Sequence, residues 1–174
     1  MRVLRGTIAV LLLAGALAPE LPRYAAERTL RVVIGALQVV LTRPAEVPDP
    51  PAALERITSI AAASATSLPG DSRPLLVAGA ARLAGGQLDA AIQTYREALL
   101  SGERAETDLN LGRAYEAEGD ASRSHAAFLR AVWINPALLS AVLPDIAAAL
   151  RDELTRLEAE LRAGRLQAPP PLPN

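Results

Sequence analysis

The strongest constraint on the fold of this chain is an internal repeat between residues 73 and 136. A shift of 33 residues places Leu76 on Leu109 and Gly79 on Gly112 in a single register. The same shift pairs three further positions: Gly86 with Gly119, Tyr95 with Phe128, and Ala98 with Ala131. A fixed period of roughly 20–50 residues is typical of architectures built from one repeated supersecondary unit. The sequence therefore predicts two similar units that pack against each other.

The composition indicates that each unit is a pair of helices rather than part of a sheet. Hydrophobic residues make up 51% of the chain, but aromatic residues only 3%. Most of the apolar residues are Ala, Leu and Val, and Ala and Leu are the strongest helix formers. We therefore expect an all-α protein with four antiparallel helices between Arg73 and Pro136. Tyr95 and Phe128 are the expected large side chains between helices.

The repeated glycines have two different predicted roles. Gly86 and Gly119 lie where the chain must reverse between the two helices of a unit. Gly79 and Gly112 lie inside helices, where a glycine costs about 1 kcal/mol relative to alanine. Close approach of a neighbouring helix is the usual compensation, so we expect one at each of these two positions.

Two units do not bury enough surface alone, because repeat proteins usually need three or more. Residues 23–67 are expected to supply two flanking helices, Arg23–Leu41 and Ala52–Ser67, joined by a stiff proline-rich connector. Their helical spacing predicts these inward-facing residues: Leu30, Val33, Ile34, Leu37, Val40 and Leu41 in the first, and Leu54, Ile57, Ile60 and Ala61 in the second.

Residues 137–164 are expected to form capping helices at the other end. Asn135 can cap a helix that begins at Pro136, and Pro144 begins a longer helix that Gly164 ends. That helix carries an apolar stripe (Leu143, Ile146, Leu150, Leu154, Leu157 and Leu161) and two predicted ion pairs (Asp152–Arg156 and Glu158–Arg162). A coiled-coil partner helix is the alternative. The proline-rich tail, residues 165–174, is expected to be extended and disordered.

The second unit resembles a tetratricopeptide repeat (TPR). The matching residues are Asn110-Leu111-Gly112, Ala114-Tyr115, Gly119-Asp120, Phe128, Ala131 and Pro136, with Ser124 where the family usually has Ala. The first unit matches at Gly79, Gly86, Ala91, Tyr95 and Ala98, but Arg82 replaces the usual aromatic residue. The resemblance covers residues 72–136, with a period one residue shorter than is usual. It implies a right-handed superhelix of antiparallel helical hairpins, a TPR-like α-solenoid.

The resemblance also implies where a partner binds. In this family the first helix of each pair lines a concave groove for peptides or partner proteins. By the family pattern the groove residues are Leu76, Ala80, Leu83, Leu109, Asn110, Arg113 and Glu116. Arg113 is expected to project into the groove and to be held by no core contact. A protein or peptide is therefore the predicted partner.

The first 18 residues have the three-part plan of a secretory signal. Arg2 and Arg5 precede the apolar run Thr7–Ala18, which ends in small-x-small patterns suited to cleavage. Pro19 would follow a cleavage after Ala18, and signal peptidase tolerates that poorly. A retained inner-membrane anchor and a buried helix remain alternatives. The expected location is periplasmic or exported, or inner-membrane anchored and facing the periplasm.

The remaining composition argues against catalysis. The chain has no Cys, which excludes thiol catalysis, thiolate metal sites, disulfides and a lipoprotein anchor, and its one His is His125. The formal net charge of −1 gives no electrostatic footprint for nucleic acid. Carboxylates such as Glu116 and Glu118 are two residues apart and so point away from each other on a helix.

We expect no enzyme, no cofactor and no metal site, but a scaffold of the bacterial cell envelope. The alternative is a membrane-anchored structural subunit of an envelope assembly or secretion complex. The oligomeric state is left open.

Overall fold

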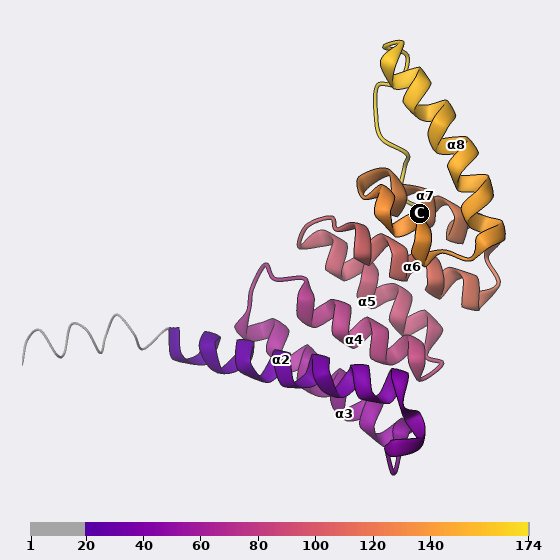
Figure 1. Ribbon diagram of the computed structural model, residues 1–174. Coiled ribbons are helices and arrows are strands. Elements are labelled where there is room, and N and C mark those ends of the chain that lie inside the picture. Colours follow the sequence, from indigo (N-terminus) through magenta and orange to yellow (C-terminus); the bar gives the residue numbers. More distant parts are fainter. Residues whose placement is uncertain (1–19, 174) are drawn as a thin grey trace, which may run out of the picture.

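The computed structural model describes residues 20–173, and this part of the chain is mostly helical and contains no strand (Figure 1). The elements are α2 (Glu20–Thr42), η1 (Pro44–Glu46), α3 (Pro50–Ser67), α4 (Arg73–Ala84), α5 (Leu88–Leu100), α6 (Ala105–Glu118), α7 (Ala121–Ile134), η2 (Pro136–Ala141) and α8 (Pro144–Arg162). The predicted all-α class is confirmed. The predicted signal or anchor, residues 1–18, lies outside the described residues.

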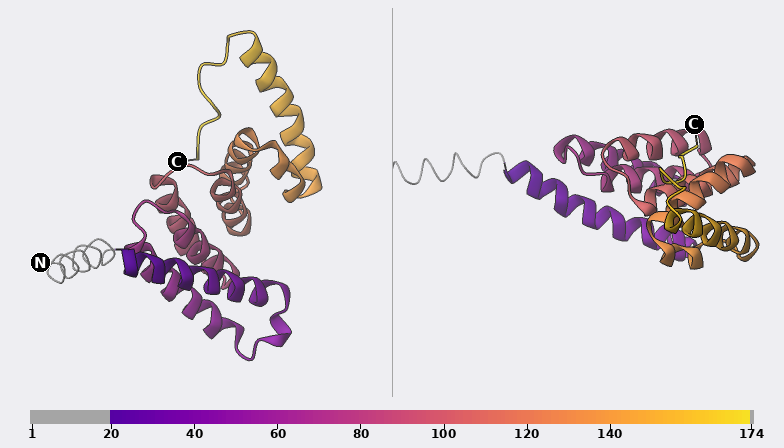
Figure 2. Two further views of the ribbon diagram at one scale, coloured as in Figure 1. Left: turned by 60° about the vertical axis from the view of Figure 1, so that its left-hand side comes forward. Right: turned by 90° about the horizontal axis from the view of Figure 1, so that it is seen from above.

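The helices pack in chain order as successive hairpins. Each helix from α2 to α7 contacts the next one, and α2 also contacts α4, as α4 contacts α6 (Figures 1 and 2). The four helices predicted between Arg73 and Pro136 are α4 to α7, in two hairpins as expected. Gly86 and Gly119 make the reversals with φ angles of 73° and 87°, a left-handed conformation that glycine adopts without a steric penalty.

The two hairpins share one packing device. A Cβ atom at Gly79 would lie 2.5 Å from Cε1 of Tyr95, and one at Gly112 would lie 2.5 Å from Cδ1 of Phe128. Both rings are buried, at 0% and 1% exposure. The absence of a side chain at each glycine therefore lets the ring of the second helix lie against the backbone of the first. The expected close approach is confirmed in both units.

Three hydrophobic clusters follow one another along the molecule. The first joins α2, α3 and α4, the second joins α5, α6 and α7 around Tyr95 and Tyr115, and the third joins α6, α7, η2 and α8 around Phe128. Within α2 the buried stripe is Ala26, Leu30, Val33, Leu37 and Val40, and within α3 it is Leu54, Ile57, Ala61 and Ser64.

Three residues predicted to face inward are exposed instead. Ile34, Leu41 and Ile60 have exposed fractions of 41%, 52% and 41%. Ile34 follows the buried Val33, and Ile60 precedes the buried Ala61. Each isoleucine lies at the edge of the helix face that contacts the neighbouring helix. Because α2 is the first described helix, its neighbours cover only one side of it. Its outer side exposes Leu21 and Val32 as well, at 66% and 68%.

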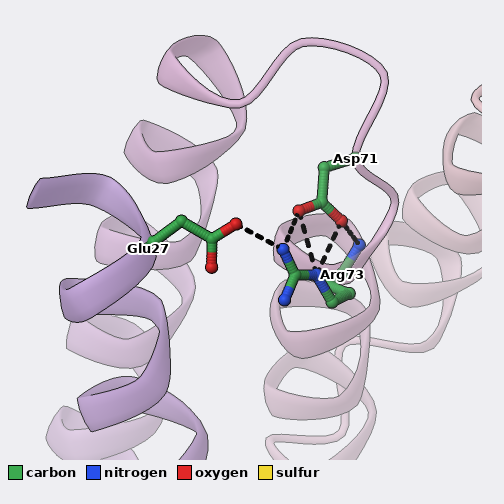
Figure 3. Close-up of polar contacts among 3 residues, drawn as sticks. All are labelled: Glu27, Asp71 and Arg73. Atoms are coloured by element: carbon green, nitrogen blue, oxygen red, sulfur yellow. Dashed lines mark hydrogen bonds and ion pairs between the residues drawn. The ribbon is translucent and has the colours of Figure 1, made fainter. Parts of the chain in front are cut away.

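An ion-pair network ties α2 to the start of α4 (Figure 3). Arg73 Nη2 lies 2.6 Å from Oε1 of Glu27, and its guanidinium also binds the carboxylate of Asp71. The guanidinium holds the pKa of Asp71 below its usual range, chiefly through these side-chain hydrogen bonds. The network fixes the position of the turn between α3 and α4 relative to α2.

The C-terminal elements close the third cluster. Asn135 Oδ1 accepts a hydrogen bond from the Ala137 amide, so Asn135 caps η2 as predicted. Ala147 and Leu150 of α8 are buried, whereas Leu143 and Leu161, at the ends of the predicted stripe, are 59% and 52% exposed. Leu143 directly precedes α8, and Leu161 lies in its last turn.

Only one of the two ion pairs predicted on α8 is present. Glu158 and Arg162 are 2.8 Å apart, as predicted. Arg156 binds Glu153 at 3.1 Å rather than Asp152, which corrects the second prediction. Glu153 also binds His125 of α7, so its carboxylate bridges α7 and Arg156, whose side chain remains exposed.

Candidate functional site

The predicted groove residues of the first hairpin are all half-buried. Leu76 and Leu83 pack against the cluster that contains Tyr95 and Tyr115, and Ala80 packs against the cluster of α2, α3 and α4. Their side chains therefore support helix packing and present only part of their surface to solvent.

In the second hairpin, η2 lies along the predicted groove face of α6. Leu109 is only 5% exposed and belongs to the third cluster, together with Phe128 and Val142. Arg113 donates hydrogen bonds to Asn110 Oδ1 at 3.1 Å and to the Ala141 carbonyl at 3.0 Å. The sequence did not predict these two bonds, which form because the chain that follows α7 returns over α6 and supplies an acceptor. Arg113 and Ala141 are both exposed, so the contact lies at the surface and not in the core.

Glu116, the last predicted groove residue, borders an open cleft. The cleft has a volume of about 450 Å³ and lies between the end of α6, the start of α7 and the first turns of α8. Ile146, Ala149 and Ala121 give it an apolar lining, and Glu116 and Asp145 supply two carboxylates. The remaining lining residues are Gly119, Ser124 and His125. Of the seven predicted groove residues, Glu116 is the one that this cleft includes.

His125 fixes α8 at the side of this cleft. Its Nε2 lies 2.8 Å from Oε2 of Glu153, and the His125 side chain is 40% exposed. The sequence did not predict this bond to α8. The two residues are 28 positions apart, so no local sequence pattern could have indicated the contact.

A second polar cluster lies at the opposite end of the α6–α7 hairpin. Arg130 binds both carboxylate oxygens of Glu103 through Nε and Nη2, and its Nη1 donates to the Pro170 carbonyl at 2.9 Å. Asp108 is fully buried near this pair, and in the described part of the chain neither of its carboxylate oxygens has a hydrogen-bond partner. Burial, with a smaller contribution from the charge of Glu103, raises the pKa of Asp108 to about 7.

The carboxylates and the single histidine are dispersed over the molecule. Among residues 20–173 no group of three or more His, Asp or Glu side chains is close enough to hold a metal ion. Over the same residues, no helix combines the length and the apolar character needed to cross a membrane. What the cleft offers chemically is an apolar surface beside two carboxylates.

No protein-family model, curated protein or solved structure matches this chain.

Proposed function

We propose that the protein is a non-catalytic interaction module, a scaffold that holds a partner protein in the cleft between α6, α7 and α8. The observation that carries the proposal is the composition of the cleft: apolar Ile146 and Ala149 beside the carboxylates of Glu116 and Asp145. An apolar surface next to negative charge favours a segment that is itself apolar and basic, such as an amphipathic helix with Arg or Lys along one edge.

The architecture of the proposed scaffold is a TPR-like α-solenoid with a right-handed superhelix. Support comes from the repeated contact of Gly79 with Tyr95 and Gly112 with Phe128, and from the successive contacts of α2, α4 and α6. Arg82, which stands where the family has an aromatic residue, reaches across to α5 and bonds Thr94 and the Ala90 carbonyl. In the proposed solenoid this polar contact replaces the aromatic packing.

The proposed location is the bacterial cell envelope, with the protein exported to the periplasm. The basic start and the apolar run of residues 1–18 support it. A second candidate is a subunit that keeps this segment as an inner-membrane anchor within an envelope assembly. The exposed Leu21 and Val32 on the outer side of α2 favour that candidate, because they lie close to the apolar run in sequence. The intact mass of the protein purified from bacterial envelopes separates the two: a cleaved chain supports the exported form, and a full-length chain supports the anchored one.

Site-specific photo-crosslinking tests the cleft itself. A photoreactive amino acid replaces Ala149, which is exposed and lines the cleft, in the full chain expressed in its native bacterium. The control places it at Ala148, the exposed neighbour that does not line the cleft. We expect one discrete adduct from position 149 and none of that mass from position 148. Equal adducts from both positions, or none from position 149, would contradict the proposal.

A further inference from the structure

The proline-rich tail makes a specific contact with the body of the protein. It leaves the far end of α8 and runs back toward α7 (Figures 1 and 2). Pro170 is buried, whereas its neighbours Pro169 and Pro171 are exposed, and Leu172 and Pro173 are half-buried. The tail is thus extended, and one proline ring and one carbonyl are in contact with the helical body.

Arg130 is shaped to receive this carbonyl. Glu103 binds Nε and Nη2, which leaves Nη1 to donate to Pro170 at 2.9 Å. Glu103 belongs to the helical body and binds two of the three nitrogens, so the guanidinium is oriented by a contact that does not involve the tail. A guanidinium presents its donors in a rigid fork, and two fixed donors set the direction of the third.

The tail has the chemistry that such a donor recognises. A chain of successive prolines adopts the polyproline II conformation, which has no internal hydrogen bonds and leaves its carbonyls free to accept. Its stiffness also lowers the conformational entropy lost on binding. Pro169, Pro170 and Pro171 therefore present the Pro170 carbonyl to Arg130 at small entropic cost.

We propose that Arg130 and Glu103 form a docking site for an extended proline-rich segment, and that the protein's own tail is its resident occupant. This site lies at the opposite end of the α6–α7 hairpin from the cleft, so the inference goes beyond the proposed function and does not depend on it. While the tail is docked, a proline-rich segment of another chain must displace it in order to bind.

A spin label on the tail tests the docked state in the full chain. The protein has no Cys, so Ala168→Cys gives a single attachment site for a nitroxide. We expect the label to broaden the amide signals around Glu103, Thr107 and Arg130 and to leave those of α3 unchanged. Adding Pro170→Gly should abolish the broadening, whereas Pro169→Gly, which loosens the chain equally but alters an exposed ring, should retain it. Absence of broadening in the parent protein, or equal loss in both variants, would overturn the proposal.

A free peptide tests whether the site recognises this sequence without the covalent link. A short flexible tether gives an effective concentration in about the millimolar range, so the peptide APPPLPN is titrated up to that range. We expect saturable binding to the Pro170→Gly protein, shifting the same amide signals, and at least tenfold weaker binding to the wild type, whose site is occupied. Adding Arg130→Gln to the Pro170→Gly protein should abolish binding. Equal affinity for wild type and variant, or no saturable binding to Pro170→Gly, would overturn the proposal.

Discussion

The ring of Phe128 lies against the backbone of Gly112, at a distance that leaves no room for a side chain. A Cβ atom at Gly112 would come within 2.5 Å of Phe128 Cδ1, and the same relationship holds between Gly79 and Tyr95 one repeat earlier. The glycine and the ring are therefore one packing unit, used twice, that sets how closely the two helices of each hairpin approach.

Gly112→Ala should destabilise the protein by about 1–3 kcal/mol, the usual cost of overpacking a core. The Phe128 ring is 1% exposed and cannot move aside into solvent. Gly35→Ala is the matched control, since Gly35 lies inside α2 with nothing within 4 Å of the added Cβ. It should stabilise the protein by up to about 1 kcal/mol through helix propensity. Denaturant unfolding measures both, and equal changes would contradict the packing described.

Phe128→Ala should lower the free energy of unfolding by about 3–5 kcal/mol, the usual cost of removing a buried phenylalanine. His125→Ala should cost less than about 1 kcal/mol, because the side chains of His125 and Glu153 remain 40% and 28% exposed and water screens their attraction. Thermal melts of the two variants compare them directly. Costs of similar size would mean that the face of α7 is wrongly placed.

Asp108 should make the protein less stable as the pH rises from about 4 to about 7. Its folded-state pKa of about 7 exceeds the unfolded value of 3.8, so in this window the unfolded chain loses a proton that the folded one retains. At about 1.4 kcal/mol per pKa unit, the total effect is about 4 kcal/mol.

Asp108→Asn should remove this slope, and unfolding curves across the pH range measure it. Asp71 acts with the opposite sign, because its pKa is lowered in the folded protein. Its contribution to stability is present above its unfolded pKa and is lost as the pH falls through the lower folded value. Between pH 4 and pH 7 the change in stability with pH therefore comes from Asp108 and not from Asp71. An Asn variant with the wild-type slope between pH 4 and 7 would contradict the assignment to Asp108.

Arg113→Glu should loosen η2 as well as alter the charge of the surface. The substitution removes the bond to the Ala141 carbonyl, which is worth about 0.5–1.5 kcal/mol. We expect a lower melting temperature and faster amide hydrogen exchange at Leu138 and Val142. Arg151→Glu, an exposed charge reversal on α8, should change neither property. Unchanged exchange at η2 in the Arg113 variant would show that the bond to Ala141 does not hold this segment.

The repeat made the hairpins predictable, because Gly79, Gly112, Tyr95 and Phe128 occur in a register that two copies of one unit must share. The spacing of apolar residues was less informative about burial at the edge of a packed helix face. Ile34 is flanked by the buried Val33, and spacing alone cannot tell which of two adjacent apolar residues has a neighbouring helix opposite it. That depends on where the next helix lies.

The candidate sites were mostly not predictable, because they depend on contacts between distant parts of the chain. The Arg113–Ala141 and His125–Glu153 bonds each join residues 28 positions apart, and Arg130 reaches Pro170 across 40. The groove was inferred from the family pattern in α4 and α6, and the sequence carries no local sign that η2 returns over α6. Glu116 borders the cleft because it lies one turn beyond the part of α6 that η2 covers.

The affinity of the wild-type protein and its Glu116→Arg variant for the partner crosslinked at position 149 tests the central claim most directly. The variant places a positive charge beside Ile146 and Ala149, where we propose that a basic, apolar segment binds. Asp152→Arg is the control, since it makes the same change of charge at an exposed position of α8 that does not line the cleft. We predict at least a tenfold loss of affinity for the Glu116 variant, about 1.4 kcal/mol, and less than a twofold change for the control. Equal affinities of wild type and the Glu116 variant would contradict binding in the cleft.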